Sequence, residues 1–146
     1  LEKSLRSENY DIVTASDGEA AWEAIQNTDN PPQLAILDWM MPKMDGLELC
    51  RRIKQRKDPF VFTIMLTAKS DNNDIISGLQ AGADEFITKP FHLEVLRNRV
   101  AAGARIVRLE NLLTMKNSIL EYYIQKVENL AQEQAKLLAE RETSHS

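Results

Sequence analysis

The chain lacks several features that would define its class. Its 146 residues include one cysteine, Cys50, so an intramolecular disulfide is excluded. It has no apolar run of about 18 residues, the length that a membrane-spanning helix needs. The net charge of −4 gives no electrostatic support for direct binding to nucleic acid. These absences predict a cytoplasmic protein without a membrane segment and without direct contact with nucleic acid.

The chain does contain a regular alternation of short apolar runs and helical patterns. Strand-like runs, bounded by turn residues, occupy residues 12–15, 34–37, 61–66 and 86–88. Helical patterns, with apolar side chains three or four residues apart, occupy residues 19–26, 46–57, 70–81 and the stretch from His92. This alternation predicts an α/β fold with a doubly wound parallel sheet.

Two local features refine this expectation. Leu1 and Leu5 are four residues apart, as in the last turns of a helix, so we expect a strand and most of a helix to precede Leu1 in the full protein. Gly78 lies inside the third helical pattern and Gly82 follows it. Because glycine is a poor helix former, we expect a weak helix there.

Three polar residues stand where the strand-like runs end. Asp38 follows the run 34–37, Thr67 ends the next run, and Lys89 follows the last one. Open α/β sheets place their ligand sites at the carboxyl ends of strands. A carboxylate can accept a phosphoryl group, and cationic and hydroxyl groups stabilise the charge on the transferring oxygens. Each residue alone is typical of a turn or a strand end, but together they favour a ligand site at this end of the sheet, and their chemistry would suit phosphoryl transfer.

The order and spacing of these residues resemble the receiver domain of bacterial two-component response regulators. The segments MMPKMDG after Asp38 and FITKPF at residues 86–91 match that family, and the resemblance covers about residues 1–100. It implies a flavodoxin-like sheet with strand order 2-1-3-4-5, of which the first strand is missing from this chain. The expected domains are a receiver domain over residues 1–103 and a coiled-coil helix over residues 104–146.

The resemblance assigns a role to each of these residues. Asp38 would be phosphorylated by a histidine kinase or a phosphotransfer protein, with Thr67 and Lys89 contacting the phosphate oxygens. The Lys89–Pro90 peptide bond would be cis and would aim Lys89 at the site. Phe86 occupies the position of the family's switch aromatic, and its ring would turn inward when Thr67 moves toward the phosphate.

The resemblance also implies a Mg²⁺ ion, bound by the Asp38 carboxylate and the Met40 backbone carbonyl. The family completes this metal site with an acidic pair at the end of the first strand, and that pair is absent from this chain. Asp11 and Asp17 are not in register to replace it. We therefore expect Mg²⁺ binding only if a segment upstream of Leu1 supplies the pair.

Two other functions stay open. A degenerate receiver would act without phosphate, as an oligomerisation or protein-interaction module. A small α/β enzyme would use Asp38 as a nucleophile, but no acid/base pair is evident in the sequence. We expect no enzymatic activity beyond self-phosphorylation and autodephosphorylation.

The last part of the chain has a heptad pattern. Its core positions, eight of ten apolar and spaced alternately by three and four residues, are Ile106, Leu109, Leu113, Lys116, Leu120, Tyr123, Val127, Leu130, Gln134 and Leu137. This pattern predicts a left-handed coiled coil that receives the signal and joins two copies of the chain through residues 104–142. Flanking apolar residues widen the stripe, so a tetrameric or antiparallel bundle stays open. The stripe could instead pack on an effector domain that is missing from this chain.

Overall fold

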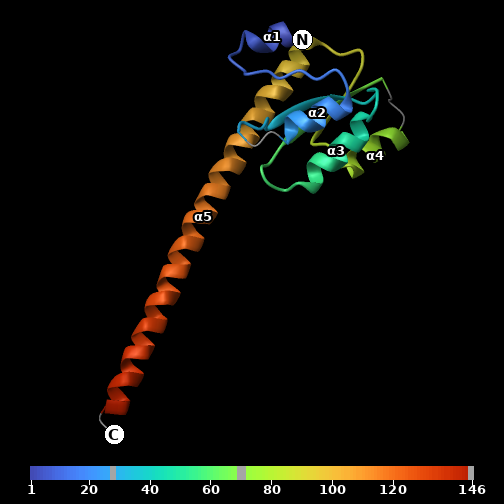
Figure 1. The fold of residues 1–146 in the computed structure, drawn as a ribbon. Helices are drawn as coiled ribbons and strands as arrows, with labels where there is room; N and C mark the ends of the chain where they lie inside the picture. The colour runs from blue at the N-terminus through green and yellow to red at the C-terminus, as the bar shows by residue number, and fades with distance from the viewer. Residues whose placement is uncertain (27–28, 69–71, 145–146) are drawn as a thin grey trace. The chain divides into compact units, whose positions relative to one another are not determined.

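The computed structural model describes residues 1–26, 29–68 and 72–144 (Figure 1). The chain divides into two units, Leu1–Arg108 and Leu109–Ser146. Its helices and strands, in chain order, are α1 (Glu2–Arg6), α2 (Gly18–Ile25), β1 (Leu34–Asp38), α3 (Gly46–Gln55), β2 (Phe62–Thr67), α4 (Asn72–Gln80), β3 (Glu85–Thr88) and α5 (Leu93–Ser144). The helix start expected at residues 70–71 lies outside the described residues.

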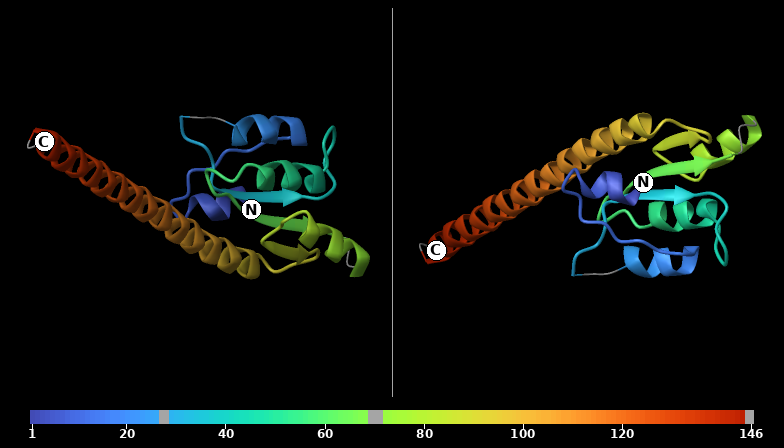
Figure 2. Two further views of the ribbon diagram at one scale, coloured as in Figure 1. Left: turned by 90° about the horizontal axis from the view of Figure 1, so that it is seen from below. Right: turned by 90° about the horizontal axis from the view of Figure 1, so that it is seen from above.

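The three strands form one parallel sheet in the order β1-β2-β3. Asp38 of β1 lies opposite Leu66 of β2, and Thr67 of β2 lies opposite Thr88 of β3. Every residue of the central strand β2 is buried, as expected for a strand covered on both faces. Helices cover the two faces of the sheet (Figure 2), which confirms the predicted doubly wound α/β fold. The order β1-β2-β3 corresponds to the last three strands of the flavodoxin-like order.

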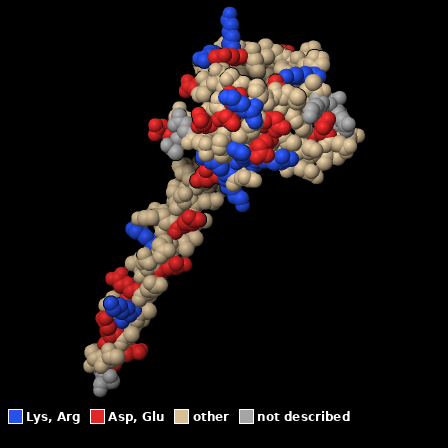
Figure 3. Space-filling model, turned by 45° about the vertical axis from the view of Figure 1, so that its right-hand side comes forward, with Lys and Arg blue, Asp and Glu red and all other residues tan. Residues whose placement is uncertain are grey.

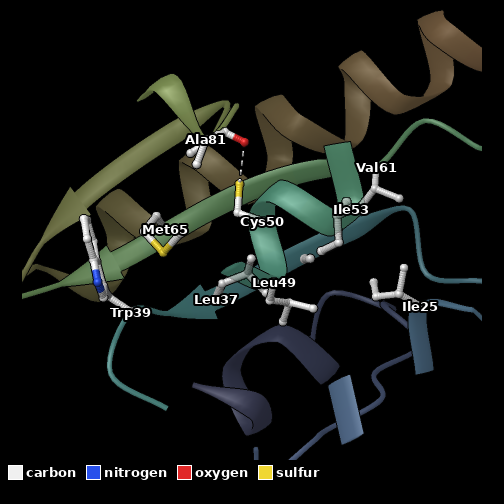
Figure 4. Close-up of a cluster of buried hydrophobic side chains, with 11 residues drawn as sticks. Ile25, Leu37, Trp39, Leu49, Cys50, Ile53, Val61, Met65 and Ala81 are labelled. Carbon is white, nitrogen blue, oxygen red and sulfur yellow. Dashed lines mark hydrogen bonds between the residues drawn. The ribbon is translucent and has the colours of Figure 1, made fainter. Parts of the chain in front are cut away.

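Each face of the sheet has its own hydrophobic core. Alternate residues of β2 point to opposite faces, so Met65 enters the first core and Ile64 enters the second. The first core, drawn in Figure 4, includes the buried face of α3 with Leu49. In the second core, α1 contributes Leu5 and the first turns of α5 contribute Leu96. Packing in the two cores fixes the positions of the carboxyl ends of the three strands.

The N-terminal segment differs from the expectation in one respect. Helix α1 is the expected helix tail, but residues 10–15 have no regular structure, so the expected strand over 12–15 is wrong. In the order 2-1-3-4-5 this segment would pair only with the first strand, which this chain lacks. An extended segment without a neighbouring strand forms no hydrogen-bonded ladder. Ile12 still packs against the second core, so its apolar character is used without a strand.

The second unit is helical from Leu109 to Ser144 as part of α5. Its apolar side chains are all exposed, among them Leu113, Leu120 and Leu130. Acidic and basic side chains are interspersed along it (Figure 3). The long helix expected after His92 is confirmed, whereas the coiled coil expected on it stays a prediction. Within the described ranges, no helix is both long and apolar enough to cross a membrane.

Candidate functional site

The carboxyl ends of the three strands bring three of the predicted site residues together. Asp38 ends β1, Thr67 ends β2, and Lys89 directly follows β3. The Lys89 amide donates to the Thr67 carbonyl oxygen at 2.7 Å, and Lys89 Nζ donates to Asp38 Oδ2 at 2.7 Å. Lys89 therefore reaches past the end of the central strand to the carboxylate on the far strand.

The Asp38 carboxylate is held from two sides and is still accessible. Oδ2 accepts the hydrogen bond from Lys89, and Oδ1 accepts one from the Met40 amide at 3.2 Å. The Asp38 side chain is 44% exposed, so a phosphoryl donor can approach it. An accessible carboxylate beside a fixed cation is the arrangement that a phosphoryl acceptor needs.

The loop after Asp38 is folded tightly against the strand ends. The Trp39 amide donates to the Leu66 carbonyl oxygen at 3.0 Å, and the Gly46 amide donates to the Trp39 carbonyl oxygen at 2.9 Å. A Cβ atom on Gly46 would lie 2.4 Å from the Asp38 carbonyl oxygen, so only glycine allows this approach. Asp45 caps α3, because its side chain accepts a hydrogen bond from the Glu48 amide. These contacts fix the backbone on both sides of the loop over residues 39–45, which we call the acceptor loop.

Thr67 and Phe86 lie on the same face of the sheet. Thr67 is buried and pairs with Thr88, and Phe86 is two residues before Thr88 on β3. Side chains two residues apart on a strand point to the same face, so Thr67 and Phe86 both face the first core, against which Phe86 packs. The Lys89–Pro90 peptide bond is cis. The structure thus places Asp38, Thr67 and Lys89 at the carboxyl ends of the strands, and Thr67 and Phe86 on one face of the sheet.

Two residues beside Phe86 were not assigned to the site from the sequence. The rings of Trp39 and Phe86 meet edge to face, with centroids 6.0 Å apart and planes at 84°. Gly78 of α4 lies so close to Phe86 that a Cβ atom there would be 2.6 Å from Phe86 Cε2. The sequence shows an indole directly after Asp38, but nothing in it indicates which ring that indole meets.

The described residues do not form a metal site on their own. Among them, no three His, Cys, Asp or Glu side chains are close enough together to hold a metal ion. Mg²⁺ requires a near-octahedral set of oxygen ligands, which the Asp38 carboxylate and one Met40 backbone carbonyl do not complete. Asp11 is exposed, and Asp17 caps α2 by accepting a hydrogen bond from the Ala20 amide at 2.9 Å. Neither aspartate replaces the acidic pair of the family.

The pKa values of two side chains outside the strand ends are shifted. The hydrogen bond from the Ala20 amide lowers the pKa of Asp17 below its ordinary value of 3.8; burial opposes this shift, and the charge of Lys43 assists it. Burial raises the pKa of the Cys50 thiol above its ordinary value of 9.0, although a hydrogen bond to Thr63 acts in the opposite direction. Cys50 is therefore a protonated core residue rather than a nucleophile.

Comparison with known proteins identifies relatives of the first unit. The family model of the response regulator receiver domain matches residues 1–101. The chain is 42% identical over 105 residues to the alkaline phosphatase synthesis transcriptional regulatory protein PhoP of Bacillus subtilis, a match that covers 72% of this chain and 42% of PhoP. It is 40% identical over 122 residues to the response regulator ArlR of Staphylococcus saprophyticus, covering 83% of this chain and 53% of ArlR.

Solved receiver domains share the fold. The receiver domain of the Francisella response regulator 1452 has a TM-score of 0.64 and 30% identity, over 71% of this chain and 84% of that one. The BeF3-activated N-terminal receiver domain of RstA from Klebsiella pneumoniae has a TM-score of 0.63 and 29% identity, over 70% of this chain and 85% of that one. The chain spans about half the length of the curated relatives it matches. The family match, the parallel sheet and these relatives show that the chain belongs to the response regulator receiver domain family.

Proposed function

We propose that the chain is a phosphoacceptor domain of a two-component response regulator, phosphorylated on Asp38 by a histidine kinase or a phosphotransfer protein. One observation carries this proposal: Lys89 Nζ lies 2.7 Å from an accessible Asp38 carboxylate oxygen at the carboxyl edge of the sheet. The buried Thr67 ends the strand between them. A cation, a hydroxyl and an exposed carboxylate together supply an acceptor and stabilise a transferring phosphoryl group.

In the proposed transfer, a carboxylate oxygen of Asp38 attacks the phosphorus atom of a phosphohistidine on the donor. The new O–P bond forms as the N–P bond breaks, and the electron pair of that bond returns to the donor imidazole. The Lys89 ammonium shifts from the Asp38 carboxylate toward a phosphate oxygen, and the Thr67 hydroxyl donates to another. Lys89 and Thr67 therefore offset the charge that the phosphoryl group brings, about −1.5 to −2 at neutral pH.

The signal would leave the site through Thr67 and Phe86. Both face the first core, and movement of Thr67 toward the phosphate changes the space available to the Phe86 ring. Phosphate would bias an equilibrium between two packings of β3 and α4 rather than create a new structure. Arg99 of α5 forms an ion pair with Glu85 at 3.2 Å, so a shift of β3 reaches α5 directly.

Receiver domains bind Mg²⁺ at the phosphorylation site, and the residues described here supply only Asp38 and the Met40 backbone carbonyl toward such a site. Mg²⁺ is part of this proposal only where residues upstream of Leu1 complete the ligand set. Such an ion would offset part of the phosphoryl charge. Asp38, Thr67 and Lys89 would keep the roles given above beside such an ion.

The test measures phosphoryl incorporation into the natural full-length protein from acetyl phosphate with Mg²⁺. We expect one phosphoryl group, located on Asp38 by borohydride reduction of the acyl phosphate and mass spectrometry of the peptides. Asp38→Asn abolishes incorporation, whereas the control Asp11→Asn, at an exposed position away from the site, does not. Incorporation that survives Asp38→Asn would overturn the assignment.

We propose further that two copies of the chain associate through residues 104–142 and that an effector domain follows. The exposed apolar side chains of the second unit and the heptad pattern support the homodimer. The greater length of the relatives, one of them named a transcriptional regulatory protein, supports the effector. On this proposal the chain acts in the cytoplasm as a signalling protein with no enzymatic role beyond self-phosphorylation and autodephosphorylation. Any contact with nucleic acid would belong to the effector.

The homodimer is tested by placing charges on the heptad core. Leu120→Glu with Leu130→Glu is expected to abolish the dimer in sedimentation equilibrium, because each buried leucine contributes about 1.5–3 kcal/mol. The matched control, Gln125→Glu with Gln132→Glu, adds the same charge on the opposite face of the helix and leaves the dimer intact. Equal masses for the wild type and the core variant would contradict the homodimer.

One observation favours a second function, that of a degenerate receiver that acts as an interaction module without phosphate. The ligands in the described part of the chain are too few for a metal ion, and phosphoryl transfer to receiver domains relies on one. The two functions separate in the experiments above. A full-length protein that takes no phosphoryl group but remains a dimer is an interaction module.

A further inference from the structure

Gly78 of helix α4 lies directly against the Phe86 ring of strand β3. An added Cβ atom would lie 2.6 Å from Cε2 and 3.0 Å from Cδ2 of Phe86. Real Cβ atoms essentially never approach another atom within 3.0 Å, so a side chain at this position would displace the ring. The sequence suggested that Gly78 only weakens α4, but the structure shows a packing reason for a residue that costs the helix stability.

Trp39 forms the second wall around the Phe86 ring. Its indole meets the ring edge to face, the favoured geometry for an aromatic pair, and is only 4% exposed. The position of Trp39 is set by the backbone, because its amide donates to Leu66 and its carbonyl oxygen accepts from Gly46. Trp39 is also the residue directly after Asp38, so the wall of this pocket is continuous with the acceptor loop.

We propose that Gly78 and Trp39 form a pocket that fixes the Phe86 ring and links the acceptor loop to helix α4. Trp39 is a positioning residue in this arrangement: it acts on Phe86 and does not touch the phosphoryl group. Gly78 keeps the pocket open, so a methyl group there displaces the ring toward solvent. The assignment of this link to signal transmission rests on the proposed function, whereas the pocket itself does not.

The pocket is tested first without phosphate, in a Trp22→Phe background where Trp39 is the one remaining indole. We expect Gly78→Ala to shift the emission of Trp39, because its ring contact is lost. We also expect a double-mutant cycle in urea unfolding to show coupling between Gly78→Ala and Phe86→Leu. Gly78→Ala raises the unfolding constant by some factor in each background. We expect that factor to be at least about five times larger with Phe86 present than with Phe86→Leu.

Gly103→Ala is the matched control, because a Cβ atom there would lie 2.5 Å from Cδ1 of Phe62 in the second core. This variant suffers the same kind of clash, so it is destabilised but leaves Trp39 emission unchanged and shows no coupling to Phe86→Leu. If Gly78→Ala is too unstable to purify, Phe86→Leu alone must shift the emission. An unshifted emission, or equal behaviour of the two glycine variants, overturns the pocket.

The link to signalling is tested with beryllium fluoride and Mg²⁺ on the natural full-length protein, in which Trp22 and any tryptophan outside the 146 residues are replaced by phenylalanine. We expect beryllium fluoride to change Trp39 emission in the parent and in Gly103→Ala, and to leave it unchanged in Gly78→Ala. A response that persists in Gly78→Ala overturns the link. A parent that binds no beryllium fluoride overturns the proposed function, while the coupling measured without phosphate still decides the pocket.

Discussion

Lys89 pairs with Asp38 at the carboxyl end of the sheet, and Lys54 pairs with Asp84 at its amino end. Both pairs join residues from distant parts of the chain, and both bring an ammonium group into contact with an aspartate. The same two residue types therefore occur at both ends of one sheet, in different surroundings. The differences lie in the other partners of each carboxylate.

The carboxylate of Asp84 is surrounded by donors. Its Oδ2 accepts from the Thr63 amide at 2.9 Å and from the Thr63 hydroxyl at 3.2 Å, in addition to Lys54. Lys54 also donates to the Val61 carbonyl oxygen at 2.6 Å, and the Cys50 thiol lies 3.9 Å from the same hydroxyl. This network ties α3, β2 and the segment before β3 together. Lys54 and Asp84 are both used within this network, so we interpret the pair as structural.

The carboxylate of Asp38 has fewer partners and more exposure. Among the described residues it accepts one hydrogen bond besides that from Lys89, a long one from the Met40 amide, and its side chain is 44% exposed against 27% for Asp84. Exposed ion pairs contribute little to stability. An ion pair with lysine therefore does not by itself identify a reactive aspartate. On the proposed function, Asp38, the accessible carboxylate at the carboxyl end of the strands, is the reactive one.

Removing Lys89 tests the reactive pair and has the largest expected effect. Lys89→Ala should slow phosphoryl transfer to Asp38 by about 100-fold, because one electrostatic contact to the transferring group is lost. Its free energy of unfolding should change by less than about 0.5 kcal/mol, as at other exposed positions. Both quantities are measured on the full-length protein, with acetyl phosphate as donor and urea as denaturant.

Lys89→Arg is the control for this variant, because it keeps the charge but not the compact ammonium group. It should transfer faster than Lys89→Ala and more slowly than the wild type. If Lys89→Ala loses stability as readily as activity, the pair at the carboxyl end is structural too, and the contrast between the two pairs fails.

Removing Asp84 tests the structural pair. Asp84→Ala should lower the free energy of unfolding by about 2 kcal/mol, since it leaves the Thr63 amide without its acceptor and the Lys54 ammonium with only the Val61 carbonyl oxygen. Phosphoryl transfer per folded molecule should be unchanged. Asp84→Asn keeps an acceptor for the Thr63 amide and should cost less than Asp84→Ala in the same urea titration. A variant of Asp84 that is fully stable but unable to accept a phosphoryl group would reverse the two roles.

The two pairs also show what can be predicted from the sequence. Asp38, Thr67 and Lys89 stand at the ends of strand-like runs, and parallel strands end at the same edge, so local patterns were enough to expect them together. Lys54 and Asp84 are 30 residues apart, in a helix and a loop, and no local signal relates them. Their pairing depends on how α3 packs on the sheet.

One sequence expectation failed and another was incomplete, because tertiary structure decides both. Residues 12–15 have the composition of a strand, but a strand needs a neighbour, and none is available to them in this chain. Gly78 was interpreted through helix propensity alone, and its reason, the ring of Phe86, comes from another element. Local sequence patterns therefore located the strand ends and the candidate site. Strand pairing and side-chain packing decided whether residues 12–15 form a strand and why position 78 is glycine.

A third Lys–Asp pair joins Lys43 Nζ and Asp17 Oδ2 at 3.6 Å. Changing this pair has the smallest expected effect on stability. Asp17 caps α2, and the hydrogen bond from the Ala20 amide holds its pKa below the ordinary value of 3.8. A carboxyl group whose pKa is lower in the folded state adds stability above pH 3.8 and loses it as pH falls through the folded value. Asp17→Asn keeps an acceptor for the cap but cannot titrate. The difference in thermal unfolding between the wild type and Asp17→Asn, followed from about pH 6 to about pH 2.5, should therefore shrink as pH approaches 3.8 and falls below it. A constant difference over that range would show that the charge of Asp17 contributes nothing to the cap.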